Sequence, residues 1–160
     1  MSEDVQLDAW SALVGVYQSV LHDVVHALEG EAGLDSGVFS ALAYLARAEP
    51  AGHLRLSALQ ELMHPRYSQP GLSRLVQRME ADGLVERRPD PDDGRASVLV
   101  LTRAGRTRFG RADVVYTSAL REHFGRHLSA AQARALTDAL APVAAKRALP
   151  RPESRTVRTA

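Results

Sequence analysis

Apolar side chains recur at steps of three and four residues along the first part of the chain. Over residues 7–29 they form a wide stripe, which predicts a long amphipathic helix. One neighbouring element cannot cover a stripe of this width, so we expect the helix to pack against another subunit as well as against its own chain. Gly30 and Gly33 end the pattern, and a shorter helix is predicted next, capped by Asp35 or Ser36.

The centre of the chain contains two shorter apolar repeats with a stop between them. The first predicts a short helix that begins at Ser57, where Gln60 completes a capping box. The dipeptide His64-Pro65 ends this helix, because proline removes a backbone donor and disfavours helical geometry in the residue before it. Ser68 is the predicted N-cap of the helix that follows.

The two faces of this following helix differ in chemistry. Its apolar residues recur at helical spacing between Leu72 and Met79, so that face is expected to be buried. Gly83 is expected to end the helix as its C′ residue. The opposite face carries long hydrogen-bond donors and one small hydroxyl, namely Gln69, Ser73, Arg74, Gln77 and Arg78.

A β-hairpin is predicted after this helix. Leu84-Val85 and Val98–Leu101 are β-rich runs, and the residues between them favour turns, which places Arg95 at the tip. Residues 54–56 are short enough to form a third strand at the edge, beside the hairpin.

Two helices joined by a short turn and followed by a hairpin form a winged helix-turn-helix. Such a unit places its second helix in the DNA major groove, where arginine reads guanine and glutamine reads adenine. An arginine at the wing tip suits the narrow minor groove. Asp93 is expected to orient the wing, because DNA phosphates would repel its carboxylate. The predicted DNA contacts are Arg66, Ser68, Gln69, Ser73, Arg74, Gln77, Arg78 and Arg95.

Helical periodicity returns after the hairpin. Thr102 is the predicted cap of a long helix that ends near Leu128, and Ser129 with Gln132 is a capping box for the last helix. Pro142 lies inside this last repeat, so we expect a kink or an early end there.

These elements predict a mainly α protein with a small β-hairpin wing (α+β), in which long dimerisation helices flank a winged helix-turn-helix. A two-fold dimer places two such readers on successive turns of DNA, so we expect a homodimer and an inverted-repeat site on double-stranded DNA. The predicted parts are an N-terminal dimerisation helix (1–34), the DNA-binding domain (35–105), C-terminal dimerisation helices (106–149) and a disordered tail (150–160).

Composition adds limits on class and location. The formal net charge of +1 is too small to imply a nucleic-acid partner, but ten arginines face six acids between residues 66 and 111. The absence of cysteine excludes disulfides and thiolate metal sites. No apolar run approaches the ~20 residues of a membrane span, and the acidic N-terminus does not resemble a signal peptide. A cytoplasmic protein without a membrane partner is expected.

The central motifs resemble those of the MarR-type regulators. Residues 68–85 look like that family's recognition helix and the entry to its wing, while Asp93-Gly94-Arg95-Ala96 and Leu101-Thr102-x-x-Gly105 are similar to its wing and strand-to-helix exit. The resemblance covers nearly the whole chain, although the reactive cysteine of the peroxide-sensing members is missing. It implies a homodimeric transcriptional regulator, usually a repressor, which a small-molecule effector releases from its operator.

The same resemblance implies an effector pocket enclosed by helices. Aromatic side chains at helical spacing are also common in a plain core, so both interpretations stay open. No cofactor is expected. The candidate ligand-binding residues are Tyr17, Phe39, Tyr44, Phe109 and Tyr116.

Two pairs of histidines suggest an alternative effector. His22 and His26 are four residues apart, as are His123 and His127, a spacing that puts two imidazoles on one helical face. Some MarR-like regulators sense zinc through histidines on comparable helices, so a divalent-metal responsive regulator of the same fold is the alternative. A complete site needs three or four ligands, and exposed or partner-satisfied histidines are the commoner explanation of such pairs. A pH-sensing role is a further alternative.

Two rival classes fit the sequence less well. An enzyme is not expected, because the chain contains neither a nucleophile-elbow motif nor a phosphate-cradling glycine pattern. A helical adaptor that binds only protein would use the same fold, and its function would survive neutralisation of Arg74 and Arg95.

Overall fold

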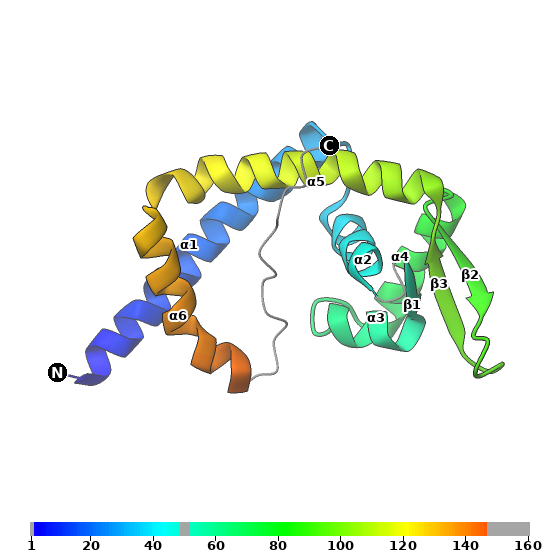
Figure 1. Cartoon of the computed structure of the whole chain (residues 1–160), viewed down its shortest axis with the longest axis horizontal. Coiled ribbons are helices and arrows are strands. Elements are labelled where there is room, and N and C mark those ends of the chain that lie inside the picture. The colour runs from blue at the N-terminus through cyan, green and yellow to red at the C-terminus, as the bar shows by residue number, and fades with distance from the viewer. Residues whose placement is uncertain (1, 49–51, 147–160) are drawn as a thin grey trace. The chain divides into compact units, whose positions relative to one another are not determined.

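The computed structural model describes residues 2–48 and 52–146 (Figure 1). The chain divides into two compact units, Met1–Leu120 and Arg121–Ala160. The elements in chain order are α1 (Ser2–Gly30), α2 (Ser36–Arg47), β1 (His53–Arg55), α3 (Leu56–Met63), α4 (Gln69–Ala81), β2 (Val85–Pro89), β3 (Ser97–Leu101), α5 (Arg103–His123), a 3-10 turn η1 (Gly125–His127) and α6 (Ala130–Lys146).

The first unit contains one three-stranded antiparallel sheet in the order β1-β3-β2. Leu99, at the middle of the central strand β3, pairs with Leu54 of β1 on one side and Arg87 of β2 on the other. The predicted third strand at the edge is confirmed, with a shift of one residue, because Leu56 already begins α3. The β2–β3 hairpin extends beyond β1 as the wing (Figure 1).

The core of the first unit lies where α2, α3 and α4 meet the sheet. Leu42, Leu59, Val76, Met79 and Leu99 are fully buried there. Only the C-terminal part of α1 reaches this core, because its buried apolar residues are confined to its last turns. The fold class is as predicted: mainly helical, with a small β wing.

The predicted cap of α2 is confirmed, whereas that of α3 is wrong. Asp35 Oδ1 accepts hydrogen bonds from the backbone N–H groups of Gly37 (2.9 Å) and Val38 (3.1 Å). In α3 the N-cap position is Arg55, which makes no side-chain cap. The chain passes from β1 into α3 without a loop, so Ser57 lies inside the first turn and cannot cap it.

The C-terminal helices differ from the predictions at their ends. The long helix α5 stops at His123 instead of near residue 128, and η1 follows it. The capping box of α6 is confirmed, since Ser129 and Gln132 exchange side-chain and backbone hydrogen bonds of 2.9 and 3.2 Å. The sequence predicts a kink or an early end at Pro142. The early end is wrong, because α6 continues to Lys146, and the kink stays a prediction. The missing hydrogen bond at Pro142 is tolerable on a helix whose described residues are mostly exposed.

Two further predictions concern the ends of the chain and the membrane. The predicted tail, 150–160, lies outside the described residues. Within the part of the chain that the structure describes, no helix combines the length and apolar character required to cross a membrane.

Candidate nucleic-acid interface

The predicted DNA-reading helix is α4, and its N-terminus forms as predicted. Ser68 is the N-cap, and its hydroxyl accepts a hydrogen bond from the backbone N–H of Gly71 at 3.3 Å. Pro70 fits the first turn, where its missing donor has no helical partner to lose. The apolar side of the helix is buried at Leu72, Leu75, Val76 and Met79. The exposed side consists of Gln69, Ser73, Arg74, Gln77 and Arg78, all five in agreement with the prediction.

The C-terminus of α4 leads directly into the wing. Gly83 adopts a left-handed φ of 67°, and its N–H bonds to the carbonyl of Glu80 at 3.0 Å. The N–H of Leu84 bonds to the carbonyl of Met79 at 2.9 Å, which completes a Schellman motif. Arg87 of β2 then pairs with Glu80 at 3.2 Å. Backbone hydrogen bonds at Gly83 and Leu84 and the Arg87–Glu80 ion pair therefore fix the direction in which β2 leaves α4.

The return of the wing into α5 is fastened to the same place. The hydroxyl of Thr102 donates towards the carbonyl of Gly83 at 2.8 Å and accepts the N–H of Gly105 at 2.9 Å, so the predicted cap is confirmed. Gly105 lies so close to the carbonyl oxygen of Leu84 that a Cβ atom there would approach it to 2.1 Å. The end of α4 and the start of α5 thus share one tightly packed joint.

The wing tip is held by a carboxylate that the sequence analysis did not single out. Asp90 is 4% exposed and accepts hydrogen bonds from Arg55 Nε (2.5 Å) and the N–H of Asp92 (2.9 Å). The Asp92 hydrogen bond, followed by the Arg55 guanidinium, holds the pKa of Asp90 below its ordinary value, although burial opposes this. Arg55 lies 35 residues earlier in the chain, so no local pattern could have revealed this pair.

The predicted orienting role of Asp93 agrees with its contact at the tip. Its Oδ1 accepts the backbone N–H of Arg95 at 3.0 Å, and Arg95 itself is exposed. This local hydrogen bond shapes the turn from which the Arg95 side chain extends.

The predicted DNA-contacting arginines divide into two groups. Arg66 donates to the hydroxyl of Ser36 at 2.9 Å, and Arg78 lies 3.4 Å from the carboxylate of Asp35. Arg74 and Arg95 have neither an acidic partner nor a side-chain hydrogen bond among the described residues. Two cations therefore remain available to an anionic partner, one on α4 and one at the wing tip.

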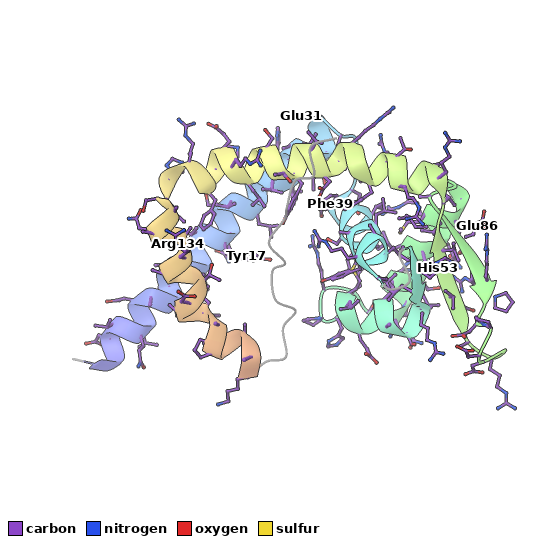
Figure 2. The ribbon with its side chains drawn as sticks, in the orientation of Figure 1. Tyr17, Glu31, Phe39, His53, Glu86 and Arg134 are labelled. Carbon is purple, nitrogen blue, oxygen red and sulfur yellow. The ribbon has the colours of Figure 1, made fainter. Side chains whose placement is uncertain are left out.

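Three of the five predicted ligand-binding aromatics meet in the first unit. Phe39 lies on α2 (Figure 2). Its ring stacks on Phe109 and Tyr116 of α5, with ring centroids 5.7 and 4.8 Å apart. Burial raises the pKa of Tyr116. Tyr44 is partly buried against the core, whereas Tyr17 is 61% exposed. The three rings pack directly against one another. Their role in ligand binding stays a prediction.

The described residues also form a depression on the first unit. It is shallow and open, and it lies along the first turns of α5. Its lining includes Leu84 and Ala104, together with the arginines at 103, 108 and 111. None of the predicted aromatic residues lines it.

The metal alternative finds no support. His127 lies in η1, beyond the end of α5 at His123, so this pair does not share one helical face as predicted. The reason is the early end of α5, after which the 3-10 turn changes the spacing. His22 and His26 are exposed on α1. Across residues 2–48 and 52–146, no group of three or more histidine, aspartate or glutamate residues could hold a metal ion.

Helices α3 and α4, with the wing that follows them, define a winged helix-turn-helix protein. Residues 32–96 match the model of the MarR family. Over these residues, which hold α2, the helix-turn-helix and most of the wing, the chain is similar to that family. Among curated protein sequences, none matches the chain.

Solved structures of MarR-family regulators share the fold over most of the chain. AbsC from Streptomyces coelicolor is 26% identical, with a TM-score of 0.78, and the match covers 91% of this chain and 95% of that one. Sco3205 from the same organism, solved in complex with DNA, is 24% identical with a TM-score of 0.75 and coverage of 90% and 88%. The regulator BldR from Sulfolobus solfataricus is 19% identical with a TM-score of 0.75 and coverage of 91% and 99%.

Proposed function

We propose that this protein is a homodimeric repressor that binds an inverted-repeat operator in double-stranded DNA. The observation that carries the proposal concerns Arg74 on the exposed face of α4 and Arg95 at the wing tip. Both are exposed, and neither has an acidic partner among the described residues. In a winged helix, α4 enters the major groove and the wing reaches the neighbouring minor groove. Sco3205, which has the same fold, was solved in complex with DNA, and this supports DNA as the partner.

The other polar residues of α4 would complete the contact. Gln69 and Ser73 lie on the first turns of the helix, where its positive end favours phosphate. Gln77 suits adenine in the major groove. Ser68 already accepts the Gly71 N–H, so its hydroxyl retains a proton to donate to a phosphate oxygen.

Exposed apolar surface supports the homodimer. The N-terminal half of α1 and the described part of α6 each expose large apolar side chains, which a second subunit would cover. Such a regulator acts on DNA, so a cytoplasmic location is expected. The exposed residues are Val5, Leu7, Trp10, Leu13, Val16 and Tyr17 on α1, and Leu136, Leu140 and Val143 on α6.

We further propose that a small-molecule effector releases the protein from DNA. The effector has to bind the conformation that cannot read the operator more tightly than the one that can. The stacked cluster of Phe39, Phe109 and Tyr116 is the candidate place, because it joins α2 to α5 inside the first unit. No enzymatic activity is proposed.

The test is DNA binding by the purified protein at two salt concentrations. The probes are the DNA upstream of its own gene, the tightest duplex selected from a random pool, and a random duplex. Arg74→Ala and Arg95→Ala are compared with Arg134→Ala, which removes an exposed arginine from α6. We expect Arg74→Ala and Arg95→Ala each to weaken binding to the selected duplex about tenfold or more. The slope of log affinity against log salt concentration should become shallower by about 0.9 for each phosphate contact that is lost. Binding equal to that of the Arg134 variant would favour the protein-only adaptor.

A further inference from the structure

The first turn of α2, Asp35–Gly37, contacts the proposed DNA-reading unit, which is α4 with the turn before it (residues 64–81), at three successive residues. Asp35 Oδ1 lies 3.4 Å from Nη2 of Arg78, near the C-terminal end of α4. Ser36 Oγ accepts a hydrogen bond of 2.9 Å from Nη2 of Arg66, in the turn between α3 and α4. Two arginines from opposite ends of the reading unit are thus held by adjacent residues of another helix.

The third residue of this turn supplies space rather than a hydrogen bond. Gly37 is buried, and a Cβ atom there would lie 1.9 Å from the hydroxyl oxygen of Tyr67. On the other side of the ring, Cδ1 of Tyr67 lies 3.7 Å from the corresponding position of Gly71 in α4. The Tyr67 ring therefore packs between α2 and the start of α4. It fixes how closely the two helices approach.

We infer that the first turn of α2 positions the DNA-reading arginines, with Ser36 acting through Arg66 and Asp35 acting through Arg78. The inference rests on the proposed DNA-binding function and adds residues that touch no DNA themselves. Long arginine side chains lose conformational freedom when they bind, and a partner that orients them beforehand reduces this loss. Neutralising Arg78 with Asp35 also weakens its attraction to phosphates of any sequence. The Asp35–Arg78 pair thereby favours sequence-specific binding over binding to DNA of any sequence.

Ser36 is tested with a double-mutant cycle against Arg66. Ser36→Ala, Arg66→Gln and the double variant are titrated with the tightest duplex selected from a random pool by the wild-type protein. We expect Ser36→Ala to weaken binding about threefold to tenfold in the presence of Arg66. It should have no effect in the Arg66→Gln background. Ser40→Ala is the matched control, because within the described residues the Ser40 hydroxyl bonds to the backbone of α2 itself, at 2.8 Å, and to no arginine.

Asp35 is tested with Asp35→Asn, which keeps the helix cap but removes the charge. The measured quantity is the ratio of affinities for the selected duplex and a random duplex, because a lost negative charge strengthens binding to both. We expect this ratio to fall about threefold to tenfold, and to be insensitive to Asp35→Asn once Arg78 is replaced by glutamine. Glu31→Gln is the matched control. Glu31 is an exposed acid just after α1 (Figure 2). None of the ion pairs among the described residues joins it to Arg66, Arg74 or Arg78.

The outcomes separate the two levels of the proposal. If wild-type protein binds no duplex, the proposed function and this inference fail together. If it binds, but Ser36→Ala and Asp35→Asn act equally with and without their arginines, the first turn of α2 has only a structural role and the inference is wrong. Thermal unfolding of every variant, at equal protein concentration, detects a loss of folding that would mimic weaker binding.

Discussion

Replacement of Gly105 by alanine tests how closely the end of α4 packs against the start of α5. The added Cβ atom would lie 2.1 Å from the carbonyl oxygen of Leu84 and 2.8 Å from Cδ1 of Leu101. Side-chain carbons do not approach backbone atoms within 3.0 Å, so the backbone has to move by nearly an ångström. The first turn of α5 cannot move this far and keep its hydrogen bonds through Thr102.

The expected loss of stability follows from these contacts. Forcing an extra carbon into a packed site costs about 1–3 kcal/mol. Each hydrogen bond of Thr102 that is lost adds about 1 kcal/mol. The better helix propensity of alanine returns at most ~1 kcal/mol. We therefore expect Gly105→Ala to lower the free energy of unfolding by roughly 2–4 kcal/mol, or Tm by roughly 5–15 °C.

Gly110→Ala is the matched control on the same helix. Gly110 is exposed, and nothing lies within 4 Å of an added Cβ atom. This variant should be more stable than wild type by about 0.5–1 kcal/mol. Both are measured by urea unfolding at one protein concentration, since association shifts apparent stability. If Gly105→Ala leaves the midpoint unchanged or raises it as Gly110→Ala does, the joint at Leu84 is not close-packed and the reasoning is wrong.

Three other substitutions test separate parts of the first unit. Ser68→Ala removes the α4 cap and should cost about 0.5–2 kcal/mol in urea unfolding, whereas Ser68→Asn should not. The pKa of Asp90 is lower in the folded protein than in the unfolded chain, so its carboxylate stabilises the fold fully above its ordinary pKa. This stabilisation is lost as the pH falls through the folded pKa. Asp90→Asn should therefore remove the share of the fall in Tm below about pH 4 that Asp90 causes. An unchanged decline would mean that other carboxylates dominate. Phe39→Ala should cost about 3–5 kcal/mol and Phe39→Leu less than about 1.5, and equal losses would contradict tight ring packing.

Features that depend on a few neighbouring residues could be predicted from the sequence. The caps at Asp35, Ser68 and Thr102 and the left-handed Gly83 all form through partners two to five residues away. The buried and exposed faces of α4 follow from its period alone. These local features account for the winged helix-turn-helix and for most of the candidate DNA contacts.

Features that depend on distant residues could not be predicted in this way. The hydrogen bonds from Arg55 to Asp90 and from Arg66 to Ser36 join residues 35 and 30 positions apart. The failed cap at Ser57 has a similar origin, because the pairing of β1 with β3 fixes where α3 begins. The sequence therefore indicates which residues are exposed for DNA. It does not indicate which of them the rest of the fold already holds.

The short helix α2 is where the proposed reading and release of DNA meet. Its first turn holds Arg66 and Arg78, and Phe39, four residues after Asp35, stacks on α5. One helical turn separates these contacts, about 6 Å along the axis. An effector that inserts between Phe39 and Tyr116 would have to displace α2, because the rings lie only 4.8 Å apart. The same displacement would change the positions of both arginines. Since such coupling is reciprocal, operator DNA should weaken effector binding by the factor by which the effector weakens DNA binding.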